Sequence, residues 1–360
     1  MATVSNQDQR WRGWLRTFSI TLATLSLLTY AAIVLIDPHD HLAVSWPAQR
    51  APINGNQRFS YPAIARSGRY DSLVIGTSTT RMLVPERLNA ALGGRFANLS
   101  MNSATAWEQS RLLEVYVRAT ADRSRPFRQL LIGMDASWCD PAETLQEVTF
   151  RTFPRWLYDS NPFNDYLQVF NARTIEQAAR QVQYWRGRLQ PRYGFDGYRD
   201  FLPPAGSYDL ARARQHIYGS EQPRRRVPPA APQYFDSKTR AAWPYAALRL
   251  LPGILESLPQ QTRVLMVFVP YHRYAQPLAG TAAHARWQEC KRRVTTYALA
   301  RDDSHVIDFM IDSAITREDR NYWDSLHYTA EIGHELVRLM AAVLEQGRGI
   351  EDRVELLTAR

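Results

Sequence analysis

Hydrophobic residues near the start of the chain form one long run without charge. Residues 17–36 are apolar, small or hydroxyl-bearing, and their number is about what an α-helix needs to cross a bilayer. Three arginines precede the run, and Asp37 and Asp40 follow it. The positive-inside rule therefore predicts a cytoplasmic N-terminus (1–16), a transmembrane anchor and an extracytoplasmic remainder. A cleavable signal peptide is the alternative, but the length of the run and the lack of a clear small-residue cleavage site favour a retained anchor.

Residues 37–69 show no sustained periodicity and are rich in Pro, Asn, Gly and Arg. Such a composition predicts a juxtamembrane linker. His39 and His41 flank Asp40 within it, at a spacing that metal sites can use. Two histidines in a flexible linker are more often simply polar, so no metal site is predicted.

From Tyr70 onward, short apolar runs alternate with amphipathic ones. The apolar runs predict buried strands at 72–75, 95–101, 129–134, 263–269 and 305–309. The helical patterns between and after them occupy 85–92, 106–120, 281–301 and 329–344. This alternation predicts an α/β domain over 70–347, a three-layer α/β/α sandwich with a five-stranded parallel sheet in the flavodoxin-like order 2-1-3-4-5. A polar tail, 348–360, follows the domain.

The alternation breaks over residues 141–261, which hold many of the aromatic residues and prolines of the chain. A helix is predicted at 171–189, a Pro-rich stretch follows at 223–232, and helical sequence resumes around 245–258. We interpret the region as an insertion over the active face of the sheet. Its rings and arginines suit sugars and anions. That the rings pack a small core of the insertion itself is an equally good interpretation.

Composition narrows the choice of partners and compartment. The 360 residues are 45% hydrophobic, and the formal net charge is +9. Nearly all of the basic residues are arginines. The densest basic run, 224–226, lies among prolines without a recognisable nucleic-acid module, so a surface suited to anionic envelope polymers is favoured over a nucleic-acid partner. Cys139 and Cys290 are the only cysteines, which excludes a disulfide-rich scaffold. The apolar stripe around Cys290 predicts a buried packing residue.

Candidate chemistry stands at both ends of the α/β region. Strand 72–75 stops at Gly76, and Ser78 follows on the next turn, at the edge where open α/β sheets bind ligands. Asp324 and His327 follow the last predicted strand, three positions apart. The carboxylate can orient the imidazole, which can then deprotonate the serine. In the predicted strand order, all three residues belong to the carboxyl edge of the sheet.

These motifs resemble those of the SGNH (GDSL-like) esterase and acyltransferase superfamily. Gly76-Thr77-Ser78 is similar to its first block and Asp324-Ser325-Leu326-His327 to its last, and the resemblance covers most of 70–344 outside the insertion. It implies Ser78 as nucleophile, His327 as base and Asp324 as the residue that orients the base. The anchor, the Ile36-Asp37-Pro38 sequence after it and the insertion look more like envelope-associated members that modify cell-wall or exopolysaccharide acyl groups. The implied location is a bacterial-type inner membrane with a periplasmic domain.

Two positions depart from the family pattern. Ser103 replaces the second-block glycine whose N–H enters the oxyanion hole, and Asp135 replaces the third-block asparagine. An ionised Asp135 would repel an oxyanion at a cost comparable to losing a donor, about 3 kcal/mol. Asn102 is the candidate replacement donor. His272, after the fourth predicted strand, is a candidate to line the site or serve as a second base, although a structural role is favoured.

The expected function is that of a membrane-anchored serine esterase or O-acyltransferase acting on acyl esters of a cell-envelope polysaccharide. A weakly catalytic or non-catalytic glycan-binding component of envelope polysaccharide machinery is the second hypothesis, and a lipid esterase at the membrane is the third. The expected partners are an acyl-ester or glycan substrate and the membrane. Residues 76–80 lack dinucleotide and P-loop fingerprints, and Arg338 stands where a zincin motif from His334 needs histidine, so no cofactor and no metal are predicted.

Overall fold

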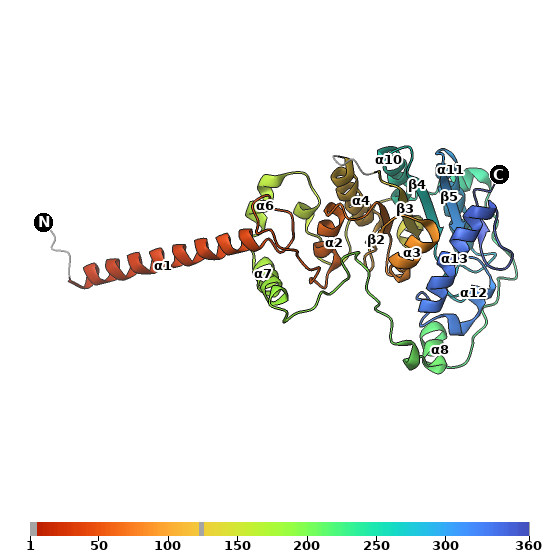
Figure 1. Ribbon diagram of the computed structural model, residues 1–360. Coiled ribbons are helices and arrows are strands. Elements are labelled where there is room, and N and C mark those ends of the chain that lie inside the picture. The colour runs from red at the N-terminus through yellow and green to blue at the C-terminus, as the bar shows by residue number, and fades with distance from the viewer. Residues whose placement is uncertain (1–5, 122–125, 360) are drawn as a thin grey trace. The chain divides into compact units, whose positions relative to one another are not determined.

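The computed structural model describes residues 6–121 and 126–359 (Figure 1). The chain divides into two compact units. One comprises Met1–Gly55 and Pro154–Arg192, and the other comprises Asn56–Phe153 and Tyr193–Arg360. The predicted insertion over 141–261 is therefore shared between the two units. The larger unit contains the sheet, and the smaller one contains the long N-terminal helix.

The larger unit is built on one sheet of six strands in the order β2-β1-β3-β4-β5-β6. The strands are β1 (Ser72–Ile75), β2 (Phe96–Asn98), β3 (Gln129–Met134), β4 (Arg263–Phe268), β5 (Ser304–Asp308) and β6 (Glu355–Leu356). The first five pair in parallel, and β6 pairs antiparallel to β5. Strands β1, β2 and β3 are buried along their whole length, as near-continuous apolar runs require. The parallel order 2-1-3-4-5 is confirmed, but the predicted count of five strands is wrong. The sixth strand has two residues, too few for a periodic signal.

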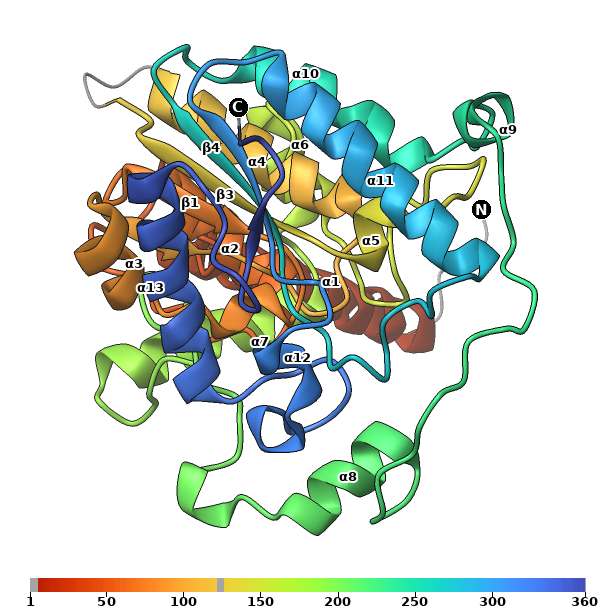
Figure 2. The same ribbon diagram turned by 90° about the vertical axis from the view of Figure 1, so that its right-hand side faces the viewer.

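Helices of the larger unit pack on the sheet and on one another. They are α2 (Gln57–Arg66), α3 (Pro85–Leu92), α4 (Ala106–Ala121), α5 (Ala136–Cys139), α8 (Leu210–Tyr218), α9 (Ser237–Ala241), α10 (Leu250–Ser257), α11 (Ala282–Leu299), α12 (Ala314–Arg317) and α13 (Ala330–Gln346). Short 3₁₀ turns are η1 (Thr80–Met82), η3 (Ala205–Ser207), η4 (Ala246–Arg249) and η5 (Asp319–Asn321). Helix α11 runs along β4 and β5 (Figure 2), α3 packs with α13, and α4 packs with α2 and α10.

Helix α2 overturns part of the linker prediction for residues 37–69. The helix is capped by Asn56 and most of its side chains are buried, so it belongs to the folded unit. Arg58 and Glu108 form an ion pair that is fully buried, with Nε to Oε1 at 2.8 Å and Nη2 to Oε2 at 2.5 Å. The prediction failed because buried polar residues, which usually lie at the surface, hid the apolar face of this helix.

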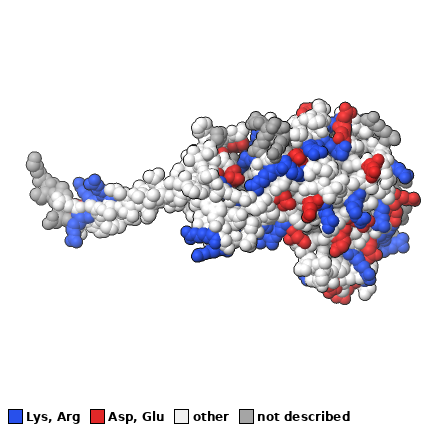
Figure 3. Space-filling view, in the orientation of Figure 1, with Lys and Arg blue, Asp and Glu red and all other residues white. Residues whose placement is uncertain are grey.

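The smaller unit joins α1 (Asn6–Ile36) to η2 (Arg155–Leu157), α6 (Pro162–Gln168) and α7 (Ala172–Trp185). By length and composition, α1 can cross a membrane, and its stretch beyond the first turns carries no charge (Figure 3). Its last turns pack with α7, and Ile33, Leu42 and Val169 form a small buried cluster. His39 lies in this unit, buried, with its Nε2 3.4 Å from Thr174 Oγ1. Residues after the apolar run thus fold onto the predicted insertion helix instead of forming a linker.

A disulfide joins Cys139 at the end of α5 to Cys290 in α11, with the two Cα atoms 5.5 Å apart. Cys290 is buried as predicted. Its role differs from simple packing, because it covalently fastens a helix to the turn that follows β3. The pairing depends on tertiary contacts between residues that lie 151 positions apart, and two cysteines alone do not specify it.

Candidate functional site

The turn after β1 lies tightly against the carboxyl edge of the sheet. Gly76 ends the strand, and a side chain at this glycine would collide with Thr80. Gly133 in β3 leaves space for the same threonine. The backbone N–H of Arg81 donates to Thr77 O at 3.2 Å, which closes the turn that carries Ser78. The two glycines thus allow the serine-bearing turn to rest directly on strands β1 and β3.

Ser78, His327 and Asp324 form a hydrogen-bonded relay. The distance from Ser78 Oγ to His327 Nε2 is 2.9 Å, and the distance from His327 Nδ1 to Asp324 Oδ2 is 2.7 Å. A carboxylate can only accept, so the Nδ1 proton donates to Asp324 and Nε2 is free to accept the serine proton. Asp324 Oδ1 also accepts the backbone N–H groups of Leu326 (2.7 Å) and His327 (2.8 Å). The structure therefore brings together the three residues that the sequence predicted, in a geometry suited to proton transfer.

The surroundings of Asp324 keep it ionised. Burial acts to raise the pKa of this carboxyl, but the hydrogen bond and charge of His327 and the two backbone N–H groups outweigh burial. The net pKa lies below its usual value, so the carboxylate is charged at neutral pH. Phe201 contacts the histidine edge-on, with ring centroids 5.8 Å apart. The imidazole is thus oriented by a charged partner on one ring nitrogen and an aromatic neighbour.

The loop after β2 presents Asn102 and Ser103. Ser103 has φ +52°, a left-handed conformation that glycine adopts most easily. Ser103 thus has a backbone conformation that suits glycine, and its side chain is exposed. Asn102 Oδ1 accepts a hydrogen bond from Arg81 Nη1 at 2.5 Å. Because a guanidinium only donates, this bond assigns the amide oxygen to Arg81 and leaves the NH₂ group as an available donor.

Arg81 was not singled out from the sequence. Its side chain is buried, at 4% exposure, and forms no ion pair with a carboxylate of the described residues. Its Cζ lies 4.5 Å from the ring centroid of Phe201 and 5.9 Å from that of Tyr193. The only available signal was its position three residues after Ser78. A cation held by an amide and aromatic faces thus lies beside the residues that contact the relay.

The side chain of Asp135 accepts hydrogen bonds that hold the turn before Ser78, and it is not a donor to an oxyanion. Its Oδ1 accepts the N–H of Ser137 (2.8 Å) and the hydroxyl of Ser137 (2.6 Å), and its Oδ2 accepts the Thr77 hydroxyl. Burial raises the pKa of Asp135, and these hydrogen bonds only partly oppose it. Asp135 therefore ties the end of β3 to the residue before Ser78. The structure records no contact of its side chain with Ser78 or His327 among the described residues.

His272 is turned toward a different polar cluster. Its Nδ1 accepts the backbone N–H of Tyr274 at 3.1 Å, so Nε2 carries the proton and donates to Asp319 Oδ1 at 3.1 Å. Burial lowers the pKa of His272, although Asp319 opposes this effect. The backbone N–H of His272 donates to Ser325 O at 3.0 Å. The residue thus supports the loop of the relay through its backbone, and its ring belongs to the Asp319 cluster.

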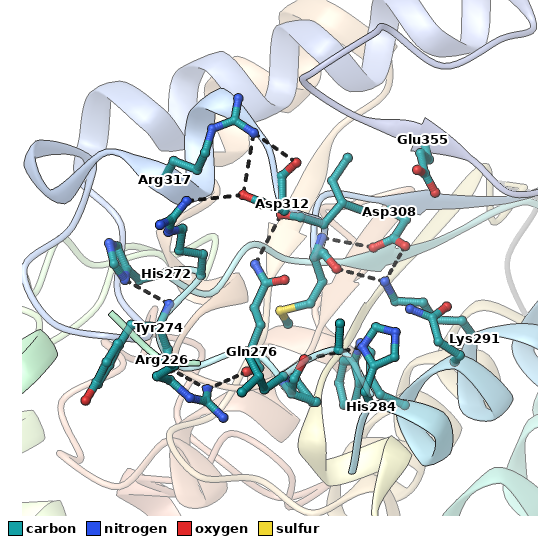
Figure 4. Close-up of a pocket in the computed structure, with 18 of the residues that line it drawn as sticks. Arg226, His272, Tyr274, Gln276, His284, Lys291, Asp308, Asp312, Arg317 and Glu355 are labelled. Carbon is teal, nitrogen blue, oxygen red and sulfur yellow. Dashed lines mark hydrogen bonds and ion pairs between the residues drawn. The ribbon is translucent and has the colours of Figure 1, made fainter. Parts of the chain in front are cut away.

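A groove of about 1310 Å³ opens in the larger unit (Figure 4), and the relay residues are not among those that line it. Residues that follow β4, the end of β5, α11 and the segment between α8 and α9 form its walls. His272 and the basic run 224–226 are the lining residues that the sequence had drawn attention to. Among the described residues, no group of His, Cys, Asp and Glu side chains is arranged to hold a metal ion.

Comparisons with known proteins gave no match: no family model, no curated protein and no solved structure is detectably similar to this chain. Chemistry must therefore be inferred from the residues themselves. The relay of a serine hydroxyl, an imidazole and an ionised carboxylate can activate an alcohol nucleophile. The amide of Asn102, whose oxygen binds Arg81 of the segment after Ser78, and the backbone N–H of Ser103 are candidate donors to a developing oxyanion.

Proposed function

We propose that this protein is a membrane-anchored serine esterase or O-acyltransferase of the SGNH type, acting on acyl esters of a cell-envelope polysaccharide. The relay from Ser78 through His327 to Asp324 is the observation that carries the proposal. Serine alone is too weak a nucleophile for ester chemistry, and the relay supplies the base that it needs. The proposed frame is a three-layer sandwich, supported by the packing of α3 with α13 and of α4 with α10.

The proposed reaction has two halves. Ser78 Oγ attacks the ester carbonyl carbon while its proton moves to His327 Nε2, and Asp324 stabilises the resulting imidazolium. When the tetrahedral intermediate collapses, the ester C–O bond breaks, and Nε2 returns the proton to the departing alcohol. Water or a sugar hydroxyl then attacks the acyl-enzyme, giving its proton to Nε2, and Ser78 leaves with that proton. Asn102 and Ser103 are the proposed donors to the oxyanion in both halves.

The proposed location is the inner membrane, with the N-terminus in the cytoplasm and the α/β unit in the periplasm. Helix α1 has the length and composition of a membrane span, and its arginines precede the apolar run. The Cys139–Cys290 disulfide supports this location, since disulfides persist in oxidising compartments such as the periplasm.

A fluorophosphonate probe tests the relay without knowledge of the substrate. The full chain in nanodiscs would be incubated with the probe and its intact mass measured, beside Ser78→Ala and His327→Ala variants. We expect a single adduct on the wild type, none on Ser78→Ala and labelling at least about 10³-fold slower on His327→Ala. Ser325→Ala is the matched control, a serine of the same loop that is not in the relay, and it should label normally. An adduct on folded Ser78→Ala, or equal labelling of His327→Ala, would refute the mechanism.

A second function, glycan binding without catalysis, is favoured by one observation. Asp135 replaces a family oxyanion donor, and its side chain is fully engaged with Thr77 and Ser137. If Asn102 does not compensate, the relay would lack sufficient oxyanion stabilisation. A folded wild-type protein that binds glycan but never reacts with the probe would establish this second function.

A further inference from the structure

The groove in Figure 4 carries more positive than negative side chains. Eight basic residues line it: Arg214, Arg224, Arg225, Arg226, Arg273, Lys291, Arg292 and Arg317. Five acidic residues do so: Asp308, Asp312, Glu318, Asp319 and Glu355. Two of the carboxylates on or near the groove are shared. Asp312 faces both Arg273 (3.9 Å) and Arg317 (3.5 Å), and Glu289 binds both Arg292 and Arg293. Arg317 also pairs with Asp352, so the lining arginines that have no ion pair among the described residues are Arg224, Arg225 and Arg226.

One wall of the groove is a strap, residues 219–236, which runs extended between α8 and α9 (Figure 2). Arg226 fixes the strap where its Nη1 donates to the carbonyl oxygens of Tyr274 and Gln276, each at 2.7 Å. Gln233 fixes it again, through its N–H to Gly280 O at 2.8 Å. Prolines between these points restrict the backbone. The strap is thus anchored at two places instead of hanging free.

Arg224 and Arg225 stand just before the first anchor and are exposed. Neither forms an ion pair with another described residue. Anchoring of the neighbouring Arg226 limits the freedom of this wall, so less entropy is lost when the two guanidiniums meet an anion. Planar guanidinium groups match carboxylate and phosphate oxygens in bidentate geometry.

Trp287 supplies a second, independent sign of a ligand. Trp287 lines the groove, and its indole Nε1 is buried without a hydrogen-bond partner among the described residues. A buried donor without a partner is costly, and Nε1 gains a partner if the indole turns toward an oxygen of a bound molecule. Tyr274, next to Arg226, offers another aromatic surface to the groove (Figure 4). Aromatic rings and hydrogen-bond donors together suit sugar rings.

We infer that this groove binds an acidic glycan, whose carboxylate or phosphate groups meet Arg224 and Arg225 and whose sugar oxygens meet Trp287. The groove exceeds the range of about 300–1,000 Å³ of small-molecule sites, which fits a segment of a polymer better than a single sugar. The inference rests on the proposed function and narrows its substrate to an anionic chain. His272 connects the two regions, because it lines the groove and its backbone bonds to Ser325 of the relay loop.

Binding can be measured on the full-length Ser78→Ala protein in nanodiscs of zwitterionic lipid, so that no turnover interferes. Calorimetry would compare oligogalacturonate, phosphorylated dextran and unmodified dextran, which separates carboxylate from phosphate recognition. We expect saturable binding of at least one anionic chain, weaker at higher salt, and at least about tenfold weaker binding of unmodified dextran.

Two substitutions locate the site. Replacing Arg224 and Arg225 by alanine should weaken binding of the anionic chain about tenfold. The matched control replaces Arg87 and Arg128, which are also exposed in the same unit but do not line the groove, and should leave affinity unchanged. Trp287→Phe keeps the ring and removes the N–H. It should weaken binding without lowering the denaturation midpoint, because no hydrogen bond within the protein is lost.

Equal binding of neutral and anionic dextran would overturn the inference, and so would equal losses from the two double variants. Binding only to nanodiscs made with anionic lipid would overturn it in favour of a membrane surface. The proposed function fails separately: a protein that binds oligogalacturonate but never reacts with the fluorophosphonate keeps the groove assignment and loses the acyl-transfer mechanism.

Discussion

Asn102 is held by Arg81, a buried cation that forms no ion pair with the carboxylates that the structure describes, and this bond determines which end of the Asn102 amide can donate. Arg81 binds the amide oxygen at 2.5 Å and is itself packed against Phe201, which contacts His327. The amide NH₂ is thereby the group available to an oxyanion. The same arrangement offers a side-chain donor even though Asp135 is engaged with Thr77 and Ser137.

Substitution of Asn102 tests this role. Asn102→Ala should slow fluorophosphonate labelling of Ser78 by about 10²-fold to 10³-fold, the usual cost of losing one oxyanion donor. Asn102→Asp keeps an oxygen for Arg81 but removes the NH₂ group, so it should be as slow as the alanine variant. The second-order labelling rate constants, with circular dichroism to verify folding, are the measurement. Wild-type labelling by Asn102→Asp would show that Asn102 only anchors Arg81.

The relay residues could be predicted, whereas Arg81 could not. Ser78, Asp324 and His327 follow recognisable strands, and the carboxyl ends of parallel strands share one edge of the sheet. Arginine, by contrast, is ordinarily an exposed residue, and no local pattern marks one that is buried without a carboxylate. The partners of Asp135 were also beyond prediction, because its contact with Thr77 joins the ends of two different strands.

At the scale of elements, Asp319 holds three segments together. It lies in η5 and accepts hydrogen bonds from Tyr218 (2.5 Å) and Arg214 (2.7 Å) of α8, and from His272 after β4. Burial acts to raise the pKa of Asp319, but hydrogen bonds from Tyr218 and Arg214 and the charge of Arg214 bring it below its usual value. The charged form therefore stabilises the packing of α8 on the α/β unit.

The sign of this shift predicts a pH dependence of stability. A carboxyl whose pKa falls on folding stabilises the fold above its unfolded pKa, about 3.9, and the benefit is lost as pH falls through the folded pKa. Asp319→Asn should therefore lower the free energy of unfolding by about 2–3 kcal/mol near neutral pH. The difference from wild type should shrink in acid. Urea unfolding at both pH values measures it, with exposed Asp312→Asn as a control that changes little. A pH-independent difference would contradict this account.

The disulfide is a second connection between elements, and its loss should be costly. It closes a loop of 151 residues between α5 and α11, and the loop-entropy account assigns such bridges about 3–5 kcal/mol. Replacing both cysteines by alanine should lower the free energy of unfolding by that amount. Reductant should destabilise the wild type to a similar extent and leave the double variant unaffected. Unchanged unfolding of the fully reduced wild type would show that the bridge does not contribute.

The bounds of a strand or helix could be predicted where its buried residues are apolar. The predicted run at 72–75 coincides with β1, and 129–134 coincides with β3, because both strands are buried on both faces. Helix α2 was missed because Arg58 is buried against Glu108, so burial there is not marked by apolar residues. The strand β6 was missed because pairing with β5, and not its own sequence, makes it a strand.

At the scale of the whole molecule, the smaller unit holds the end of the long apolar helix α1. The segment after α1 does not trail away from it. The carboxylate of Asp37 accepts the backbone N–H groups of His41 (2.8 Å) and Leu42 (2.9 Å), and Leu42 packs with Ile33 and Val169. The end of the helix is thus capped by a folded unit that includes α6 and α7. If α1 spans the membrane, this unit must lie on the same side as Asp37.

Orientation in the membrane should therefore depend on the charges at the start of α1. Arg10, Arg12 and Arg16 precede the apolar run, and the positive-inside rule predicts that their end stays in the cytoplasm. In spheroplasts, protease should digest the α/β unit and spare an N-terminal tag. Changing the three arginines to glutamate should invert the orientation of part of the protein population. The basic residues that favour a cytoplasmic N-terminus are then lost. The same change at three exposed arginines of the α/β unit, Arg87, Arg128 and Arg338, should leave the orientation unaltered, since charges far from the span contribute little.

A wild-type tag that is removed while the α/β unit resists digestion would place the unit in the cytoplasm, where neither the disulfide nor an envelope substrate is expected.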